Sequence, residues 1–433
     1  MEGTGASNME IEVQDYPPIF QLPNELLLEI FEYLGFRDKL NLTFTCYGMR
    51  ILISLHLNLC INFQRDLASF MCYMDSLKNS TVLPVVEGVN FDMKVNKNTK
   101  FILPPPLSPG LLVPFTSLTS CSFRLGLGVS DGSVIEGVLK SLPPGLKSLK
   151  LEAGVGERTY EEIRGTPIAN ATLKNWNPIK NLTSLTSLEL EGIRPLGVEV
   201  LRLIAKLPLT SLKLECNIGG RGTMVRQLRI GPICTISSLT SLTIRNYRLY
   251  GGEGRDVVRD NVLQTLGDLT SLRHLRLEKC TGIGRDDTWN ISSHSSLETL
   301  YLSTYEMTNL NRWWTQIGMM KNLTSLSVVQ EDAAAIVGVN NGILQLKGLS
   351  KLKELHLPYI TFSKRIMREL ICEEGLTSLE TLRCGCEGSP CSDIPEMRRC
   401  LEFRETTTNL AERYDIVTLG QVLPLYVHTE MEM

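Results

Sequence analysis

The tetrapeptide LTSL recurs along most of this chain and leads each time into apolar residues spaced as LxxLxL. It begins at Leu182, Leu209, Leu239, Leu269, Leu323 and Leu376. A single unit of this kind cannot bury its own leucines, so neighbouring units have to stack and bury one another. The repeat therefore predicts a solenoid, a shape that presents an extended surface and lacks an obvious pocket.

The spacing of the repeat also predicts the secondary structure of each unit. The first leucine of the LxL step recurs every 24 to 33 residues, at Leu188, Leu212, Leu242, Leu275, Leu300, Leu326, Leu355 and Leu382. An alternating apolar pair flanked by polar residues is typical of a short strand with one buried face, whereas longer apolar patterns at 198–207 and 257–269 favour helices. We therefore expect an α/β solenoid, a horseshoe with parallel strands inside and helices outside.

Less regular units extend the array toward the N-terminus. They lie at Leu149 with Leu151, at Cys121 with Phe123, and at Val89 with Phe91, the last as a capping strand. The step of 39 residues from Leu149 to Leu188 departs from the pattern. We expect an insertion around 154–178 to form a loop or a second helix.

The units resemble the leucine-rich repeats of intracellular adaptors. The fuller motif of that family, LxxLxLxxN or LxxLxLxxC, ends in a side chain that bonds the backbone of the turn. Asn217 and Cys280 stand at that place, whereas Tyr247, Ile360 and Glu387 stand there in other units. The resemblance therefore implies a polar ladder that is only partly built.

Composition indicates what kind of protein carries these repeats. The net charge is -3, from 44 basic and 47 acidic residues, which argues against a dedicated binder of nucleic acid or anionic membranes. Residues 1–15 lack the charged start and apolar core of a secretory signal. The most apolar run, 51–63, is too short to span a bilayer. We expect a protein of the cytoplasm and/or nucleus whose twelve cysteines are reduced.

Residues 18–62 do not follow the repeat. Pro23 suits the first turn of a helix, Glu25 suits its positive end, and Gly35 can terminate it. Asp38 can cap a second helix, and 49–59 extends the apolar pattern. A broad apolar face is predicted on the first helix, from Leu26, Leu27, Ile30, Phe31 and Leu34. Two or three short helices cannot bury so much apolar surface among themselves, so we expect a partner surface to cover it.

This segment resembles an F-box, whose pattern runs LPxELLxxIFxYLxxxDLxxxxxVCxxWR. The matches, in order and spacing, are Leu22, Pro23, Glu25, Leu26, Leu27, Ile30, Phe31, Tyr33, Leu34, Asp38, Cys46 and Arg50. Lys39, Thr45 and Met49 depart from the pattern. In that family the F-box docks onto the Skp-type linker of a cullin-RING ubiquitin ligase, while the repeats hold a substrate. By position, the resemblance implies that this interface is contacted or supported by Leu22, Pro23, Leu26, Ile30, Phe31 and Leu34.

The alternative is a helical cap that shields the first repeat, because the ends of solenoids need covers. The LPxELL opening combines a helix start signal with a matched apolar face, which favours docking. The predicted organisation is a disordered N-terminus at 1–17, an F-box at 18–62, a linker helix and N-terminal cap at 63–115, leucine-rich repeats at 116–392 and a C-terminal cap at 393–433. The resemblance implies a substrate adaptor of an SCF-type ligase, and the alternative is a repeat scaffold without a ligase.

We find no catalytic constellation in the sequence. The five histidines are scattered, with no HExxH motif, and the glycine-rich stretches lack the phosphate-binding pattern GxxxxGK[ST]. Cys384, Cys386, Cys391 and Cys400 are the best metal candidates, but their spacing fits no common zinc pair. We predict a protein that is not an enzyme and holds no metal or cofactor.

The residues between and just after the strand leucines are predicted to face the concave wall. The substrate-binding candidates there are Glu189, Glu191, Lys213, Glu215, Arg245, Arg276, Glu278 and Tyr301. An acidic patch near 189–191 grades toward a basic one near 245–276. The gradient could select a complementary protein surface, or the wall could be an ordinary solvated face, and the sequence leaves both open.

Overall fold

The strands of this protein form one long parallel sheet. The computed structural model describes residues 22–34, 38, 41–42, 58–62, 88–93, 112, 115, 117–125, 132–153, 176–193, 196–216, 226–250, 262–283, 295–304, 310–330, 341–362, 364–371 and 375–386. The sheet has twelve strands in the order β1-β2-β3-β4-β5-β6-β8-β10-β11-β12-β13-β14. Neighbours in the sheet are thus neighbours in sequence, except where β7 and β9 pair separately.

The strands are short and the elements between them are compact. The first six strands are β1 (Asn58–Asn62), β2 (Gly88–Met93), β3 (Ser120–Leu125), β4 (Ser148–Ala153), β5 (Ser187–Glu191) and β6 (Ser211–Glu215). The others in the sheet are β8 (Ser241–Arg245), β10 (His274–Cys280), β11 (Thr299–Thr304), β12 (Ser325–Gln330), β13 (Glu354–Phe362) and β14 (Thr381–Cys386). The separate pair is β7 (Arg226–Arg229) and β9 (Tyr247–Tyr250).

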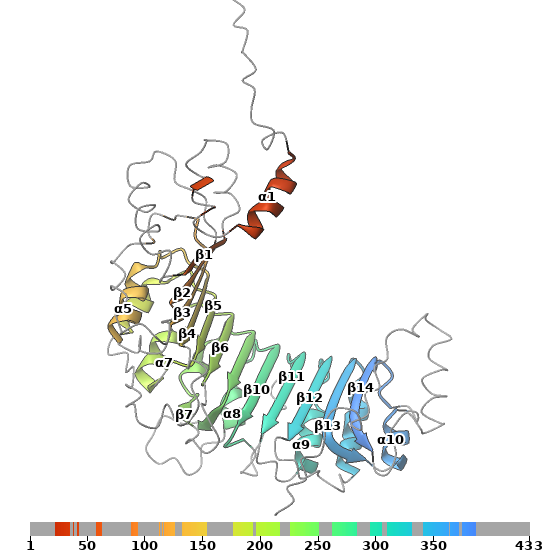
Figure 1. The fold of residues 1–433 in the computed structure, drawn as a ribbon. Coiled ribbons are helices and arrows are strands. Elements are labelled where there is room, and N and C mark those ends of the chain that lie inside the picture. Colours follow the sequence, from red (N-terminus) through yellow and green to blue (C-terminus); the bar gives the residue numbers. More distant parts are fainter. Residues whose placement is uncertain are drawn as a thin grey trace, which may run out of the picture.

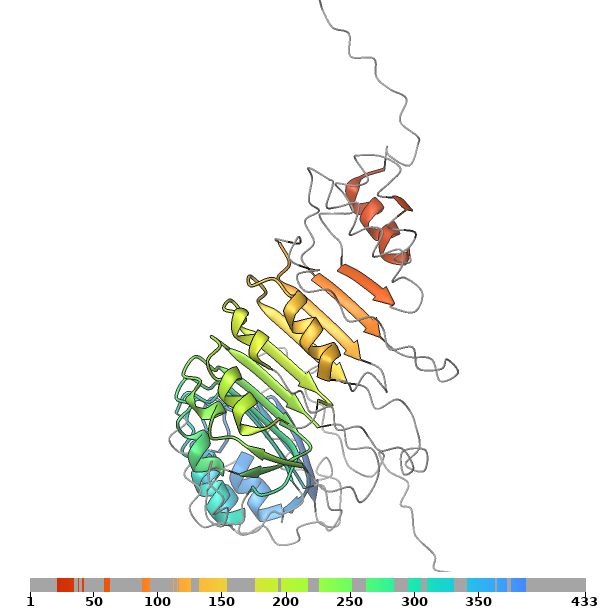
Figure 2. The same ribbon diagram turned by 90° about the vertical axis from the view of Figure 1, so that its left-hand side faces the viewer.

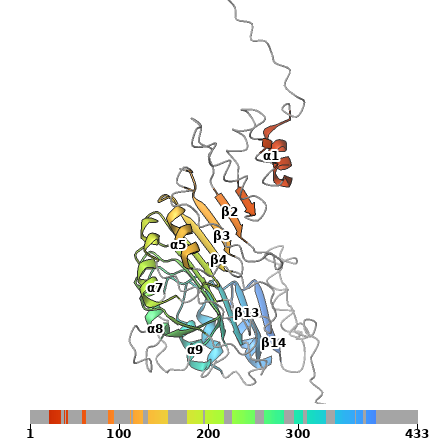
Figure 3. The ribbon, with the colours of Figure 1, turned by 60° about the vertical axis from the view of Figure 1, so that its left-hand side comes forward.

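The helices lie on the convex side of the sheet (Figures 1 and 2). They are α5 (Gly132–Ser141), α7 (Val198–Ile204), α8 (Val262–Leu266), α9 (Leu310–Ile317) and α10 (Lys364–Ile371), with 3-10 turns η2 (Asn177–Asn181), η3 (Ile233–Thr235) and η5 (Asn341–Gly348). Helix α1 (Asn24–Tyr33) lies apart from them, at the β1 end of the sheet (Figure 1). The sheet curves from β2 round to β14 (Figure 3), which confirms the predicted leucine-rich-repeat horseshoe.

The repeated leucines form the core. Each first leucine of the LxL steps from Leu188 to Leu382 has at most 7% of its surface exposed, and all belong to one contiguous apolar cluster. Fully burying one such side chain contributes about 1.5–3 kcal/mol, so several per unit stabilise a thin body along its whole length. The core therefore runs through the array as a continuous layer between sheet and helices.

The threonines of the repeat tie each unit to the one before it. The Thr240 and Ser241 N–H groups both donate to the Thr210 carbonyl, at 2.9 and 3.0 Å, and the Thr240 hydroxyl donates to the same oxygen at 3.0 Å. Thr210 and Thr324 make the corresponding hydroxyl bonds at 3.2 and 3.0 Å. A side-chain donor that joins the backbone ladder explains why threonine precedes these strands.

The sheet extends further toward the N-terminus than the sequence pattern indicated. Residues 58–62, predicted to belong to the helical F-box segment, form strand β1, which pairs with β2 through Leu59 and Val89. The apolar run 51–63 obscures the alternation of polar and apolar residues in NLCIN. Strand β1 covers the edge that β2 would otherwise expose, so the capping role predicted for β2 belongs to β1.

Other predictions have mixed outcomes. Helices α7 and α8 lie inside the two predicted helical patterns. Cys280 is buried at the end of β10, and its thiol lies 3.4 Å from the carbonyl of Ile244 in strand β8, so its partner is a strand residue, whereas the motif implies the turn; Asn217 lies outside the described residues. Of the insertion predicted around 154–178, only 176–178 are described, and they lead into η2; the predicted N-terminal disorder, linker helix and C-terminal cap lie outside the described residues. None of the described helices combines the length and hydropathy that a bilayer-spanning segment needs.

Candidate protein-interaction surfaces

Helix α1 carries apolar side chains on two neighbouring faces, about 100° apart around the helix axis. The outer face of α1, as we name it, comprises Leu22, Leu26, Ile30 and Tyr33, which are 36%, 46%, 38% and 85% exposed. On the inner face Leu27 and Phe31 are buried, and Leu34 packs partly buried against the same core as the repeats. Steps of three or four residues within each set place its members on one side of the helix.

The start and end of α1 follow from its sequence. The Pro23 carbonyl accepts from the N–H groups of Leu26 and Leu27, both at 3.1 Å, so the helix begins directly after the proline. Glu25 lies in the first turn, near the positive end of the helix dipole. The helix ends at Tyr33, and the Leu34 N–H donates to the Phe31 carbonyl at 3.2 Å. The predicted helix start is therefore confirmed.

The outer face of α1 is where apolar exposure concentrates. Among the described residues, five large apolar side chains are exposed, and the only one of the five elsewhere is Met319. Of the six residues predicted at a linker interface, Leu22, Pro23, Leu26 and Ile30 are exposed, Phe31 is buried and Leu34 is half-buried. Phe31 and Leu34 are thus placed to hold the helix on the repeats. Tyr33 was not among the six, although it matches the F-box pattern.

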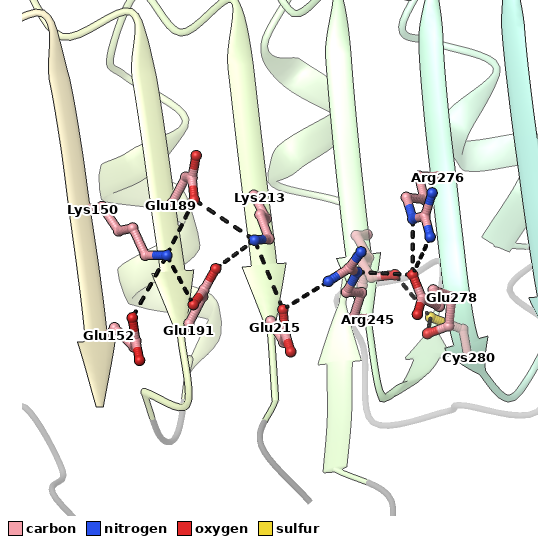
Figure 4. Close-up of polar contacts among 11 residues, drawn as sticks. Lys150, Glu152, Glu189, Glu191, Lys213, Glu215, Arg245, Arg276, Glu278 and Cys280 are labelled. Carbon is pink, nitrogen blue, oxygen red and sulfur yellow. Dashed lines mark hydrogen bonds and ion pairs between the residues drawn. The ribbon is translucent and has the colours of Figure 1, made fainter. Parts of the chain in front are cut away.

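A network of charged side chains covers the concave wall from β4 to β10 (Figure 4). The parallel register aligns these side chains in two rows across the strands. One row alternates in sign, as Lys150, Glu189 and Lys213, and the other runs Glu152, Glu191, Glu215, Arg245 and Glu278. The charge network, as we name it, comprises Lys150, Glu152, Glu189, Glu191, Lys213, Glu215, Arg245, Arg276 and Glu278. Seven of the eight predicted substrate-binding residues belong to it.

Contacts in the charge network run from strand to strand. Lys150 Nζ lies 3.2 Å from Glu191 Oε2, and Glu191 Oε1 also contacts Lys213 Nζ. Further along, Arg245 Nη1 lies 3.4 Å from Glu215 Oε2. Arg245 Nε is 2.9 Å from Glu278 Oε2, but its N–H has no hydrogen-bond partner, so this contact is an ion pair without hydrogen-bond geometry.

Ion pairs reduce the predicted gradient without reversing it: within the charge network, β4 to β6 carry four glutamates and two lysines, and β8 and β10 carry two arginines and one glutamate. Glu191 is 12% exposed and contacts two lysines, so the predicted acidic patch is compensated by its neighbours. Arg276 donates through Nε to Glu278 Oε2 at 2.8 Å and has Nη2 2.7 Å from the same oxygen, so the predicted basic patch is compensated too. The register places the carboxylates of Glu152, Glu191 and Glu215 in adjacent strands, and Lys150 and Lys213 of the neighbouring row contact them.

The two central groups of the network have shifted pKa values. Partial burial opposes ionisation of Glu191, but hydrogen bonds from Lys213 and Lys150, and their charges, outweigh it and lower the pKa of Glu191. Partial burial likewise opposes ionisation of Lys150, but the hydrogen bond and charge of Glu191, with the charges of Glu152 and Glu189, raise the pKa of Lys150. Both shifts favour the ionised pair and thus stabilise the network at neutral pH.

The concave wall changes character after β10. The Arg276 guanidinium carbon lies 3.8 Å from the centre of the Tyr301 ring, so the planar group stacks on the phenol. Next along the same register position come Ser327 and His356, whose Oγ and Nδ1 atoms are 3.3 Å apart. From β11 on, the described side chains at this position are those of Tyr301, Ser327 and His356, so the wall has a part rich in ion pairs and a part without them.

A hollow of about 280 Å³ lies where these two parts meet, across β8, β10, β11 and β12. Its polar lining residues are Thr243, His274, Arg276, Thr299, Tyr301, Ser325 and Ser327. The sequence prediction missed His274, Thr299 and Ser325 because it considered only residues between and after the leucines. Alternation along a strand was the available signal, since residues two apart face the same side.

The described cysteines are unsuited to nucleophilic chemistry. Cys121, Cys216, Cys234 and Cys280 are buried thiols that are not joined in disulfides, as expected of reduced cysteines. Burial raises the pKa of Cys234 and of Cys280 to about 12, so both remain protonated thiols at neutral pH. Within the described residues, no group of three or more histidine, cysteine, aspartate or glutamate side chains is placed to hold a metal ion.

Comparisons with known proteins agree with the N-terminal assignment. Residues 19–62 match the family model of the F-box-like domain. No curated relative matches this chain. Similar solved structures include an internalin (inlF) from Listeria monocytogenes, with 18% identity over 63% of this chain and a TM-score of 0.38. The match spans 62% of that internalin. An internalin C2 (inlC2) from the same species has 19% identity over 51% of this chain and 75% of its own, with a TM-score of 0.31.

Helix α1 thus lies within the F-box-like match, whereas most of the curved sheet lies outside it, in the repeats. F-box domains generally bind Skp-type linkers, and proteins of the F-box and leucine-rich-repeat families are typically adaptors without catalytic activity. The exposed outer face of α1 lies within the matched residues 19–62. This chain therefore combines an F-box-like segment at 19–62 with a leucine-rich-repeat solenoid that follows it.

Proposed function

We propose that this protein is the substrate-recognition adaptor of an SCF-type cullin-RING ubiquitin ligase. The outer face of α1 docks the Skp-type linker, and the concave wall of the repeats binds a protein target. Such an adaptor acts in the cytoplasm and/or nucleus and raises the local concentration of a target lysine beside a ubiquitin-loaded enzyme held elsewhere in the complex.

The exposed outer face of α1 is the observation that carries the proposal. Leu26 and Ile30 stand one turn apart and are both over a third exposed, inside the segment that matches the F-box-like model. Apolar side chains repeated at helical spacing suit a helix-in-groove mode of binding, in which a partner supplies the missing burial. A monomer in water gains nothing from this exposure, whereas a complex gains the burial energy.

The arrangement of the sheet supports a division of labour between the two ends. From β1 beside α1 to β11 in the part of the wall without ion pairs, the sheet order takes eight strand-to-strand steps. At about 4.8 Å per step, the two surfaces are roughly 40 Å apart along the sheet. A linker at one and a target at the other can therefore bind together without contact.

The second candidate is a repeat scaffold without a ligase, in which the N-terminal helices only cap the array. The burial of Leu27 and Phe31 in the common core favours capping. The two roles use different faces of α1, so capping alone leaves the outer face without a purpose. Variants confined to one face therefore separate the two candidates.

The direct test is binding of a purified Skp-family linker to the full chain and to the double variant Leu26→Ala and Ile30→Ala. Alanine maintains helix propensity, so the change removes apolar surface while α1 persists. Losing two side chains of this exposure should weaken binding by about 2 kcal/mol, a factor of about thirty in Kd. Isothermal titration calorimetry measures the difference.

The matched control exchanges two exposed polar residues of the same helix, Glu25→Ala and Glu29→Ala, and we expect it to bind nearly as the unaltered chain does. Melting temperatures of both double variants should stay close to that of the unaltered chain. If the unaltered protein does not bind the linker at all, the adaptor proposal is wrong and the scaffold remains.

A further inference from the structure

We infer that the hollow between β8 and β12 is the target-anchoring subsite of this adaptor and that it takes one tyrosine-like side chain, an aromatic ring with a polar tip, from a protein target. The inference rests on the proposed function for the identity of its partner as a ligase target. Its physical basis is independent of α1, because it concerns only the size, charge and chemistry of the concave wall.

The size of the hollow indicates a side chain as its occupant. About 280 Å³ is below the range of roughly 300–1,000 Å³ typical of sites that bury a whole small molecule. The hollow lies on a continuous wall of neighbouring strands, and the rest of a protein partner can cover that wall. An anchor side chain in a shallow recess, surrounded by flatter contacts, is how binding energy concentrates at protein interfaces.

The charge of the hollow disfavours an ionised occupant. Arg276 is the one lining residue, among those described, that is charged at every ordinary pH, and its Nε and Nη2 atoms already face Glu278 Oε2. A target carboxylate would compete with Glu278 for that cation. None of the described lining residues is acidic, so a target lysine or arginine would find no counterion within the hollow. A neutral side chain avoids both costs.

Planar groups provide the contact for an aromatic ring. Arg276 stacks one face of its guanidinium on Tyr301 at 3.8 Å, and its side chain is still 39% exposed. A second aromatic ring can therefore stack on the accessible part of this cation, since guanidinium groups pack on aromatic faces. Arginine and tyrosine are also among the residues that most often dominate interface energetics.

Hydroxyl groups provide partners for a polar tip. Thr299 Oγ1 lies 2.9 Å from His274 Nδ1, and Ser325 donates to Glu354 Oε2 at 2.8 Å. A hydroxyl has one donor and two acceptor sites, so each can accept a further hydrogen bond. A purely aliphatic occupant would displace water from the remaining acceptor sites of these hydroxyls without offering a hydrogen bond in return. The phenol of tyrosine matches both the ring contact and the polar floor.

The test measures binding of N-acetyl-L-tyrosinamide to the full chain by saturation-transfer NMR. Comparison probes are the matching amides of phenylalanine, leucine and aspartate, each up to about 10 mM, because one side chain alone supplies millimolar affinity at best. We expect the strongest signal from the tyrosine probe, a weaker one from phenylalanine, and the weakest from leucine and aspartate. Equal or stronger binding of the aspartate or leucine probe overturns the inference, as does the absence of tyrosine binding.

Two leucine substitutions, at equivalent register positions of two different strands, test where the probe binds. Ser325→Leu fills the hollow, whereas Ser187→Leu places the same apolar side chain at the equivalent position of β5, outside the lining. We expect Ser325→Leu to reduce the tyrosine signal at least threefold and Ser187→Leu to leave it unchanged. Comparable melting temperatures of the two variants exclude unfolding as the cause, and Tyr301→Ala should reduce the signal without filling the hollow. A signal that survives in Ser325→Leu places the probe elsewhere and refutes the subsite.

Linker binding by the same samples separates this inference from the proposed function. We expect Ser325→Leu and Tyr301→Ala to bind the Skp-family linker as the unaltered chain does, since α1 lies at the far end of the sheet. Linker binding without a tyrosine site refutes only the subsite. A tyrosine site without linker binding refutes only the adaptor role, and the hollow then anchors a partner of a scaffold.

Discussion

The outer face of α1 and the charge network of the concave wall differ in how their side chains are compensated. The outer face leaves apolar side chains such as Leu26 46% exposed. In the charge network, central carboxylates such as Glu191 have cationic neighbours within the same wall. The first surface lacks partners for its side chains, and the second supplies them internally.

This difference indicates how each surface can contribute to binding. Covering apolar area is favourable with any partner of the right shape, so the outer face of α1 suits a constant partner. Desolvating ion pairs that are already formed costs energy and offers little net attraction. The charge network therefore fixes the shape of the wall, and selective contacts concentrate where the network ends, around Arg276 and Tyr301.

The largest expected effect contrasts two adjacent residues of α1, one on its outer face and one on its inner face. Phe31 is 6% exposed and Ile30 is 38% exposed. Phe31→Ala should destabilise the attachment of α1 by about 3–5 kcal/mol, the usual cost of deleting a buried phenylalanine. Ile30→Ala should cost less than about 1 kcal/mol, because a partly exposed side chain loses less burial.

Hydrogen exchange of the α1 amides measures this contrast, since the end of a repeat array can open without global unfolding. We expect much faster exchange in Phe31→Ala and nearly unaltered exchange in Ile30→Ala. Equal effects of the two substitutions would show that α1 has no distinct inner and outer faces.

The second largest expected effect is a difference in stability loss between a substitution at the centre of the charge network and one at its margin. Glu191, 12% exposed, contacts two lysines closely, whereas Glu189, 38% exposed, lies 3.7 Å from Lys213 and 4.0 Å from Lys150. Glu191→Gln should lower stability by about 1–2 kcal/mol, between the values for exposed and for buried ion pairs. Glu189→Gln is the matched control and should cost less than about 0.5 kcal/mol. Denaturant melts that rank the two variants in the reverse order would contradict the network as described.

A smaller expected effect is the pH dependence of the stability difference between Glu191→Gln and the unaltered chain. The pKa of Glu191 is lowered from 4.5 on folding, so its stabilisation is complete above that pH and is lost as the pH falls through the folded value. The pKa of Lys150 is raised from 10.5, so its stabilisation is complete below that pH and is lost as the pH rises through the folded value. The melting temperature of Glu191→Gln should thus approach that of the unaltered chain below about pH 4.5. If the difference in melting temperature stays constant down to acidic pH, the stability loss in Glu191→Gln comes from packing and not from the lost charge.

The sequence sufficed to predict the horseshoe because the apolar period fixes both strands and core. Leu188 and Leu242 had to be buried once the units stacked, and both are fully buried. Strand β1 was missed because one short alternating segment, 58–62, lies within a longer apolar run. Periodicity is informative over many units and ambiguous over five residues.

The sequence was less informative about the surfaces. Helical spacing put both Leu26 and Phe31 on a broad apolar face, but only packing against the repeats decides which of them is covered. Charge order along the chain suggested a gradient, whereas the register pairs Glu215 with Arg245, thirty residues later. Residues that are distant in sequence become neighbours in every strand-to-strand step, and a linear pattern does not contain that information.

The smallest expected effect is that of salt, and it sharpens the comparison of the two surfaces. Raising the salt from about 0.1 to 1 M shortens the screening length from about 10 Å to about 3 Å. Linker binding through the outer face of α1 should change less than about threefold in Kd, because burial of apolar area is not screened. The stability gap between the unaltered chain and Glu191→Gln should shrink by a few tenths of a kcal/mol, since close and partly buried pairs are screened only weakly. Titrations and melts at both salt concentrations measure the two effects. Linker affinity that falls tenfold or more in high salt would show that charged contacts, and not the outer face of α1, dominate docking.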